Sequence, residues 1–310
     1  MISDKNYRKL TKKIKDSCLL ALPQSAVKIL ELSKDPDNGP QEFSAAIATD
    51  LGLTSQILKF VNSSYFGFRH KITTIPMALS LVYGRTIKNF ILWNAVFALL
   101  PNPKCGQFDL RKICQDALRR GIFAKIIASH IPDIDPDEML LNAMFQDMAL
   151  PILVQTWPAE YADILTRKQN EGKRLSELEQ SVFGWTHAVA GAFLVDEWGF
   201  GDEFSACIEN HLAPDFNFNA NTATIEQIRN TIVGISSFLP SVMDSEWDKD
   251  EADLFFQGYS RLHRPTMPRP DDLFEQTDQQ ITEMSEVVHL EEIPKSLVEF
   301  HKEYVTRIGV

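Results

Sequence analysis

Apolar residues recur along most of this chain at intervals of three and four positions, the spacing that places them on one face of an α-helix. Leu53, Ile57, Leu58 and Val61 show the pattern within one short stretch. Hardly any segment alternates apolar and polar residues with the period of two that a half-buried strand requires. The pattern therefore predicts an all-α protein.

The predicted helices are separated by short stretches rich in Pro, Gly, Asn and Asp, residue types that favour turns. The main expected helices, in chain order, cover residues 25–32, 43–51, 53–61, 85–100, 110–130, 137–157, 158–171, 175–183, 186–198, 202–212, 224–239, 271–288 and 293–308.

Residues 57–84, ILKFVNSSYFGFRHKITTIPMALSLVYG, read as a helix, a tight loop and a second helix. Short polar side chains after Val61 compete for backbone hydrogen bonds, and Gly67 tolerates a positive φ, so the first helix is expected to end there. Thr74 is a candidate N-cap, with Pro76 in the first turn of the next helix. We expect Tyr65 or Phe66 in this loop to be buried between the two halves of the molecule.

The organisation of the chain follows from changes in composition. We expect a lead-in helix at 1–18, a helical body at 19–240, and an acidic linker with a C-terminal helical extension at 241–310. Within the body, PNPKCGQFD separates a first helical subdomain, 19–104, from a second, 110–240.

Two segments of the extension, DSEWDKDEAD and HRPTMPRPDD, are rich in charge and proline and are interpreted as linkers. Leu297, Tyr304 and Ile308 share one face of the last predicted helix and could dock it on the body.

The charge of the chain limits its partners. A formal net charge of −11 disfavours non-specific binding to nucleic acid or to an anionic membrane, so we expect neither partner. One group of basic residues at helical spacing is an exception to this negative charge, and we interpret it as the solvated face of a helix. The group comprises Arg111, Lys112, Arg119, Arg120 and Lys125.

The sequence also predicts a cytoplasmic location. The first residues lack the apolar core of a signal peptide, and the apolar run from 90 to 100 is shorter than the about 20 residues that a spanning helix needs. The four cysteines have no CxxC spacing, which favours reduced thiols.

The hairpin at 57–84 resembles the signature of the HDOD family, bacterial signalling domains related to metal-dependent HD phosphohydrolases. The resemblance rests on the loop residues Asn62, Ser63, Tyr65 and Gly67, and extends over residues 19–239. Two later segments, FGWTHAVAGAFLVDEWGF and CIENHLAP, are similar to family segments that contain His187 and His211. The resemblance implies that the second subdomain is a helical bundle of the HD type.

The same resemblance locates a metal site whose pattern is altered here. The His-Asp pair of the family corresponds to Gln146 and Asp147, and an amide is a poor metal ligand. An upstream His corresponds to Asp116 and a downstream Asp to Ser237, while Leu212 replaces the second His of a pair. We therefore expect no bound metal or cofactor and no catalytic residue.

These observations favour a non-catalytic signalling or regulatory module that binds a partner protein or a small ligand. Two alternatives stay open. One is a metal-dependent phosphohydrolase with an atypical site built from Asp116, Asp147, His187 and His211. The other is nucleotide binding without hydrolysis in the same cleft, assisted by the nearby Arg119, Arg120 and Lys125.

Overall fold

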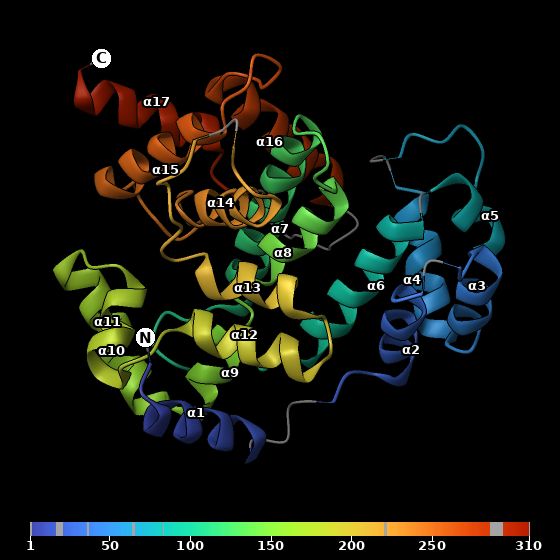
Figure 1. Ribbon diagram of the computed structural model, residues 1–310, viewed down its shortest axis with the longest axis horizontal. Coiled ribbons are helices and arrows are strands. Elements are labelled where there is room, and N and C mark those ends of the chain that lie inside the picture. The colour runs from blue at the N-terminus through green and yellow to red at the C-terminus, as the bar shows by residue number, and fades with distance from the viewer. Residues whose placement is uncertain are drawn as a thin grey trace.

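The computed structural model describes residues 2–16, 21–35, 37–63, 66–82, 84–219, 222–285 and 294–309. Every regular element in these ranges is an α-helix, which confirms the all-α prediction. The helices form two bodies that lie side by side (Figure 1). We call α2–α6 the first lobe, and α1 together with α7–α17 the main body.

The first lobe consists of five helices that follow one another in the chain. They are α2 (Gln24–Ser33), α3 (Pro40–Ala48), α4 (Leu51–Val61), α5 (Ile75–Leu81) and α6 (Gly84–Leu99).

The loop between α4 and α5 is closed by one side chain. The Asn62 amide donates to the carbonyl of Ile72 at 2.8 Å and accepts from the Ile72 N–H at 2.7 Å. Thr74 caps α5 as predicted, because its hydroxyl accepts from the N–H of Met77. Gly67 has a φ of +59°, a conformation that glycine adopts without steric cost. These contacts explain why an asparagine and a glycine stand in the loop.

The main body is built around α7 (Leu110–Ser129), which packs closely against α8 (Pro136–Phe145). A Cβ on Gly121 of α7 would lie 2.4 Å from Met144 and 2.9 Å from the Leu140 carbonyl oxygen, so this crossing requires a glycine. Further helices surround the pair: α9 (Ala149–Thr156), α10 (Pro158–Glu171), α11 (Leu175–Phe183), α12 (His187–Glu197), α13 (Asp202–Asn210) and α14 (Ile225–Ser237).

Helix α1 (Asp4–Asp16) precedes the first lobe in the chain but packs against the main body, beside α9 and α12 (Figure 1). Leu10 and Ile14 are buried there. Asn6 donates to the carbonyl of Phe183 at 3.2 Å, and Lys15 pairs with Glu197 at 3.0 Å. The first lobe is therefore an insertion between two segments of the main body.

Side chains of α6 join the two bodies. The Thr86 hydroxyl donates to Asp137 at 2.8 Å, and the rings of Phe97 and Phe145 lie 6.3 Å apart. The sequence predicts that Tyr65 or Phe66 forms this contact. Phe66 is half-buried against Phe60 and Phe68 within the first lobe, so for this residue the prediction is wrong, and Tyr65 lies outside the described residues.

The C-terminal extension folds onto the main body as three helices, α15 (Lys249–Leu262), α16 (Pro270–Ser285) and α17 (Leu297–Ile308). The linker interpretation of DSEWDKDEAD is wrong, because α15 begins inside that run. Trp247, just before α15, is buried and donates its indole N–H to the carbonyl of Phe238 at 2.8 Å. On α17, Leu297 and Tyr304 are buried as predicted, whereas Ile308 is 38% exposed.

Candidate functional site

The ends of three helices converge in the main body and bring three polar side chains together. Asp147 follows the end of α8, His187 is the first residue of α12, and His211 directly follows α13. One ligand atom from each lies within 4.8 Å of the others. The structure thus groups three of the residues predicted for the HD-type site.

The geometry of this group is centred on one carboxylate oxygen. Oδ1 of Asp147 lies 3.1 Å from Nε2 of His187 and 3.5 Å from Nε2 of His211. Both histidines are buried, and neither Nε2 atom has a hydrogen-bond partner among the described residues. Two imidazole nitrogens and one carboxylate oxygen therefore face a common point.

His187 is oriented from behind by Glu179 of α11, which is fully buried. The Nδ1–H of His187 donates to Glu179 at 2.6 Å, and its backbone N–H donates to the same oxygen at 2.9 Å. The Tyr161 hydroxyl donates to the other oxygen at 2.7 Å. Burial, together with this carboxylate, raises the pKa of Tyr161 well above its ordinary value, so the phenol keeps its proton. The chain directs Nε2 of His187 toward Asp147.

His211 is fixed by a backbone acceptor instead. Its Nδ1–H donates to the carbonyl of Ile208 at 2.6 Å. Burial, and secondarily the neighbouring His187, hold the pKa of His211 well below its ordinary value. The imidazole is therefore neutral at pH 7, with the lone pair of Nε2 directed at Asp147.

A guanidinium occupies the other side of Asp147. Arg120 of α7 forms an ion pair with Oδ2 of Asp147, and both side chains are largely buried. This contact was missed by our interpretation of the basic group as a solvated face. It supplies a fixed positive charge to the carboxylate from within the fold.

The other basic residues of that group also depart from the solvated-face interpretation. Arg119 is 1% exposed and donates to the carbonyls of Pro240 and Lys295, which attaches the C-terminal extension to α7. Lys125 pairs with Asp137 at 2.7 Å. Arg111 and Lys112 are exposed, as expected.

The remaining predicted positions do not join the cluster. Asp116 accepts from the Ser241 hydroxyl at 2.5 Å and from the Val242 N–H at 2.8 Å, so it stabilises the turn before the extension. Gln146 donates to the Ser236 hydroxyl at 3.3 Å. Ser237 touches the site only through the backbone, because its hydroxyl donates to the carbonyl of His211 at 2.9 Å.

Two residues of the site escaped the sequence analysis altogether, Tyr161 and Glu179. Glu179 precedes His187 by eight residues and lies on a different helix, so no helical or strand periodicity connects them. Tyr161 occurs in an ordinary amphipathic pattern on α10. Only the packing of α10 and α11 brings them behind His187.

Comparisons with known proteins agree with this architecture. The model of the HDOD domain family matches residues 19–214. The uncharacterised protein YuxH of Bacillus subtilis (strain 168) is 30% identical over 115 residues, which is 37% of this chain and 27% of that protein. The chain thus spans little more than a quarter of this relative.

Similar solved structures are also helical. A candidate phosphohydrolase from Shewanella amazonensis SB2B is 18% identical with a TM-score of 0.67, covering 90% of this chain and 97% of its own. An HDOD domain protein of unknown function from Geobacter sulfurreducens is 15% identical with a TM-score of 0.63, at 99% and 96% coverage. A candidate signal transduction protein from Marinobacter aquaeolei VT8 is 16% identical with a TM-score of 0.68, at 92% and 64%.

No helix among the described residues is both long and apolar enough to cross a bilayer.

Proposed function

The chain belongs to the HDOD domain family, and from this premise we propose that it is a signalling or regulatory module that acts by binding and not by catalysis. The observation that carries the proposal is the ion pair between Arg120 and Asp147. In this ion pair, a guanidinium of the chain itself contacts the one carboxylate that the chain retains from the HD pattern.

Three physical arguments support an absence of catalysis. A metal at Asp147 would have to compete with a guanidinium for the same carboxylate, and like charges at short range repel. Gln146 offers no imidazole, and its side chain is engaged with Ser236. Asp116, the expected upstream ligand, is held at the turn of residues 241–242. The polar cluster then serves to hold the ends of α8, α12 and α13 together.

One observation favours a second candidate, a metal-dependent phosphohydrolase. Asp147, His187 and His211 each present one ligand atom at a common point, and both Nε2 atoms have no hydrogen-bond partner among the described residues. Two imidazoles and one carboxylate are a suitable donor set for a divalent transition metal. Such an ion would activate water for attack on phosphate. Glu179 would orient His187 as a ligand, as carboxylates behind metal-bound histidines commonly do.

The three basic side chains that would assist nucleotide binding in the cleft are engaged in contacts within the chain. Arg119 donates to two carbonyls, Arg120 pairs with Asp147 and Lys125 pairs with Asp137. We therefore place the binding partner elsewhere, and propose a protein of a signalling pathway or a small molecule.

Metal content and turnover separate the two candidates. The chain is purified from medium supplemented with Mn, Fe, Ni and Zn, then assayed for bound metal and for hydrolysis of a generic phosphodiester. We expect no metal-dependent turnover in the wild type or in Arg120→Ala, which frees Asp147. Arg111→Ala, an exposed arginine on the same helix, is the matched control. Metal-dependent hydrolysis that disappears in Asp147→Asn would make the enzyme the correct assignment.

A single restored residue should not restore activity. Gln146→His returns the imidazole beside Asp147, but Asp116, Leu212 and Ser237 still depart from the family pattern, and a working site needs a complete and oriented ligand set. We expect at most weak metal uptake and no turnover above background. Metal-dependent hydrolysis by this variant would show that the site is one substitution away from activity.

A further inference from the structure

Helix α1 concentrates positive charge on an acidic protein. It contains six of the 31 lysines and arginines of the chain, but only two of the 42 acidic residues. Four of the six are exposed and follow one another at i, i+3, i+4 and i+7, so they share one face of the helix. This basic stripe comprises Lys5, Arg8, Lys9 and Lys12. We propose that it binds an acidic α-helix of a partner protein.

The basic stripe faces away from the main body. Leu10 and Ile14, on the opposite side of the helix, are buried against the main body. In Figure 1, α1 lies along the edge of the main body, and no other helix lies beyond it. No residue of the stripe forms an ion pair with another described residue. The four charges are therefore accessible to a partner.

The attachment of α1 to the main body uses the other two lysines. Lys15 pairs with Glu197 at 3.0 Å, and Nζ of Lys13 lies 5.0 Å from the centre of the Trp157 ring. The stripe adds nothing to this attachment, and like charges three and four positions apart destabilise a helix. An anionic partner would offset that repulsion.

The shape of the charged surface indicates a narrow partner. From Lys5 to Lys12 the stripe is about 10 Å long, at 1.5 Å per residue. Carboxylates lie close to one side of α1, because burial and then Asp196, Glu209 and Glu197 raise the pKa of Tyr7. A single helix with carboxylates at i, i+3, i+4 and i+7 matches the length and spacing of the stripe.

Longer polyanions fit this surface less well. A nucleic acid or an anionic membrane would extend past the stripe and meet a chain with a net charge of −11. A helix that lies in a membrane surface also inserts its apolar face, whereas Leu10 and Ile14 are buried in the protein. A second copy of the chain would add another net charge of −11. A short acidic helix avoids these costs.

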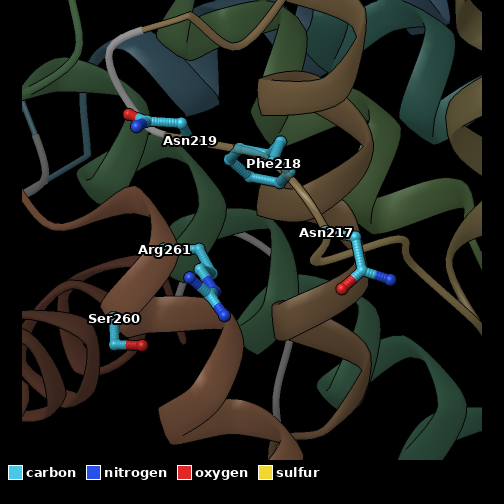
Figure 2. A pocket seen from close by; sticks show the side chains of 5 residues that line it. All are labelled: Asn217, Phe218, Asn219, Ser260 and Arg261. Carbon is cyan, nitrogen blue, oxygen red and sulfur yellow. The ribbon is translucent and has the colours of Figure 1, made fainter.

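The hollow of about 580 Å³ between the loop after α13 and the end of α15 is a weaker candidate for a partner surface (Figure 2). Arg261 is the only cation in its described lining, which also comprises Asn217, Phe218, Asn219 and Ser260. All of these except the half-buried Phe218 are exposed, so water can satisfy their polar groups. The hollow therefore lacks the density of like charge that the basic stripe has.

Fluorescence anisotropy with the full chain tests the proposal. The probe is a labelled, alanine-based helical peptide of about 20 residues with Glu at i, i+3, i+4 and i+7. We expect a Kd below about 1 mM in about 0.02 M salt, and binding at least about fivefold weaker in about 0.2 M salt. A peptide of the same composition, with its Glu residues spread around the helix, should bind at least about threefold more weakly.

A fourfold variant assigns the binding to the stripe. Lys5→Gln, Arg8→Gln, Lys9→Gln and Lys12→Gln together keep good helix formers in α1 and should weaken binding at least about fivefold. The matched control removes three lysines and one arginine that are exposed in the first lobe and in the segment after it, and should change the Kd by less than about twofold. It combines Lys59→Gln, Arg69→Gln, Lys71→Gln and Lys104→Gln.

Several results would overturn the proposal. These are no binding of the peptide, equal binding of the two peptides, or equal losses in the fourfold variant and its control. Vesicles that contain phosphatidylserine and a duplex DNA are titrated in parallel, and tighter stripe-dependent binding to either would assign the surface to that polyanion. Self-association that the fourfold variant loses, in sedimentation velocity, would assign it to a second copy. The proposal rests on the proposed binding function, but metal-dependent turnover tests that function separately, so the two can fail independently.

Discussion

The two bodies differ in the partners that their buried polar side chains have. In the main body several buried side chains are linked to one another: Arg120 pairs with Asp147, and Tyr161, Glu179 and His187 form a hydrogen-bonded chain. Nε2 of His187 and of His211 nevertheless has no hydrogen-bond partner among the described residues. In the first lobe, the indole N–H of Trp93 is buried without a hydrogen-bond partner among the described residues. At the position of the HD-type site, Asp147 is thus engaged by contacts within the chain.

This comparison predicts that loss of a buried charge is far more costly in the main body than loss of an exposed one at the first lobe. Arg119→Met should lower the free energy of unfolding by about 3–5 kcal/mol, because two carbonyls lose their donor and nearby carboxylates lose a cation. Arg85→Met removes an exposed partner of Asp135 and should cost about 1 kcal/mol or less. Urea denaturation measures both, and equal costs would contradict the comparison.

Glu179 should be the next most sensitive position. Glu179→Gln replaces an acceptor of three hydrogen bonds with an amide that must direct its N–H₂ at donors, and should cost about 2–3 kcal/mol. Glu177→Gln, on the exposed face of the same helix, is the control and should change stability by less than about 0.5 kcal/mol. A small effect at Glu179 in thermal and urea unfolding would mean that His187 is positioned by packing alone.

Acidification should act mainly on the main body. The pKa of His211 is depressed in the folded state, so the unfolded state binds an extra proton below about pH 6.5. The contribution of His211 to the free energy of unfolding is therefore fully present above that pH. It falls by up to about 1.4 kcal/mol per pH unit as the pH decreases toward the folded-state pKa. His211→Gln should flatten this slope in metal-free protein kept in a chelator.

The control for the pH profile is His70→Gln, which alters an exposed residue of the first lobe and should leave the slope unchanged. Denaturation curves between pH 5 and 8 give the comparison directly. An unchanged slope in His211→Gln would assign the acid sensitivity to other groups.

The smallest effects should come from exposed apolar side chains. Leu51 in the first lobe is 82% exposed, and Ile225 in the main body is 53% exposed. Substitution of either by lysine should change stability by less than about 0.5 kcal/mol. A clearly larger loss at Leu51 alone, measured by thermal unfolding, would show that this surface of the first lobe is covered in solution.

Local sequence signals predicted where the helices lie better than they predicted what surrounds the side chains of those helices. The Thr74 cap and the end of α4 at Asn62 follow from short-range chemistry. Helix α15 was missed because its charged first turn resembled a linker, although Asp248 caps it.

The candidate site was predictable only in part. Asp147, His187 and His211 are far apart in the chain and were grouped by resemblance alone. Arg119 and Arg120 were misjudged because α7 has neighbours on several sides, and the extension that covers Arg119 follows more than a hundred residues later.

The position of α1 has a consequence for the order in which the protein is made. Asn6 bonds to Phe183, 177 residues further along the chain. At about 5–20 residues per second, a ribosome needs roughly 10–35 s between the two. During that interval Leu10 and Ile14, buried in the finished fold, have no surface to cover them, whereas the whole first lobe can already assemble. Helix α1 is therefore synthesised early but can dock only after the helices that receive it.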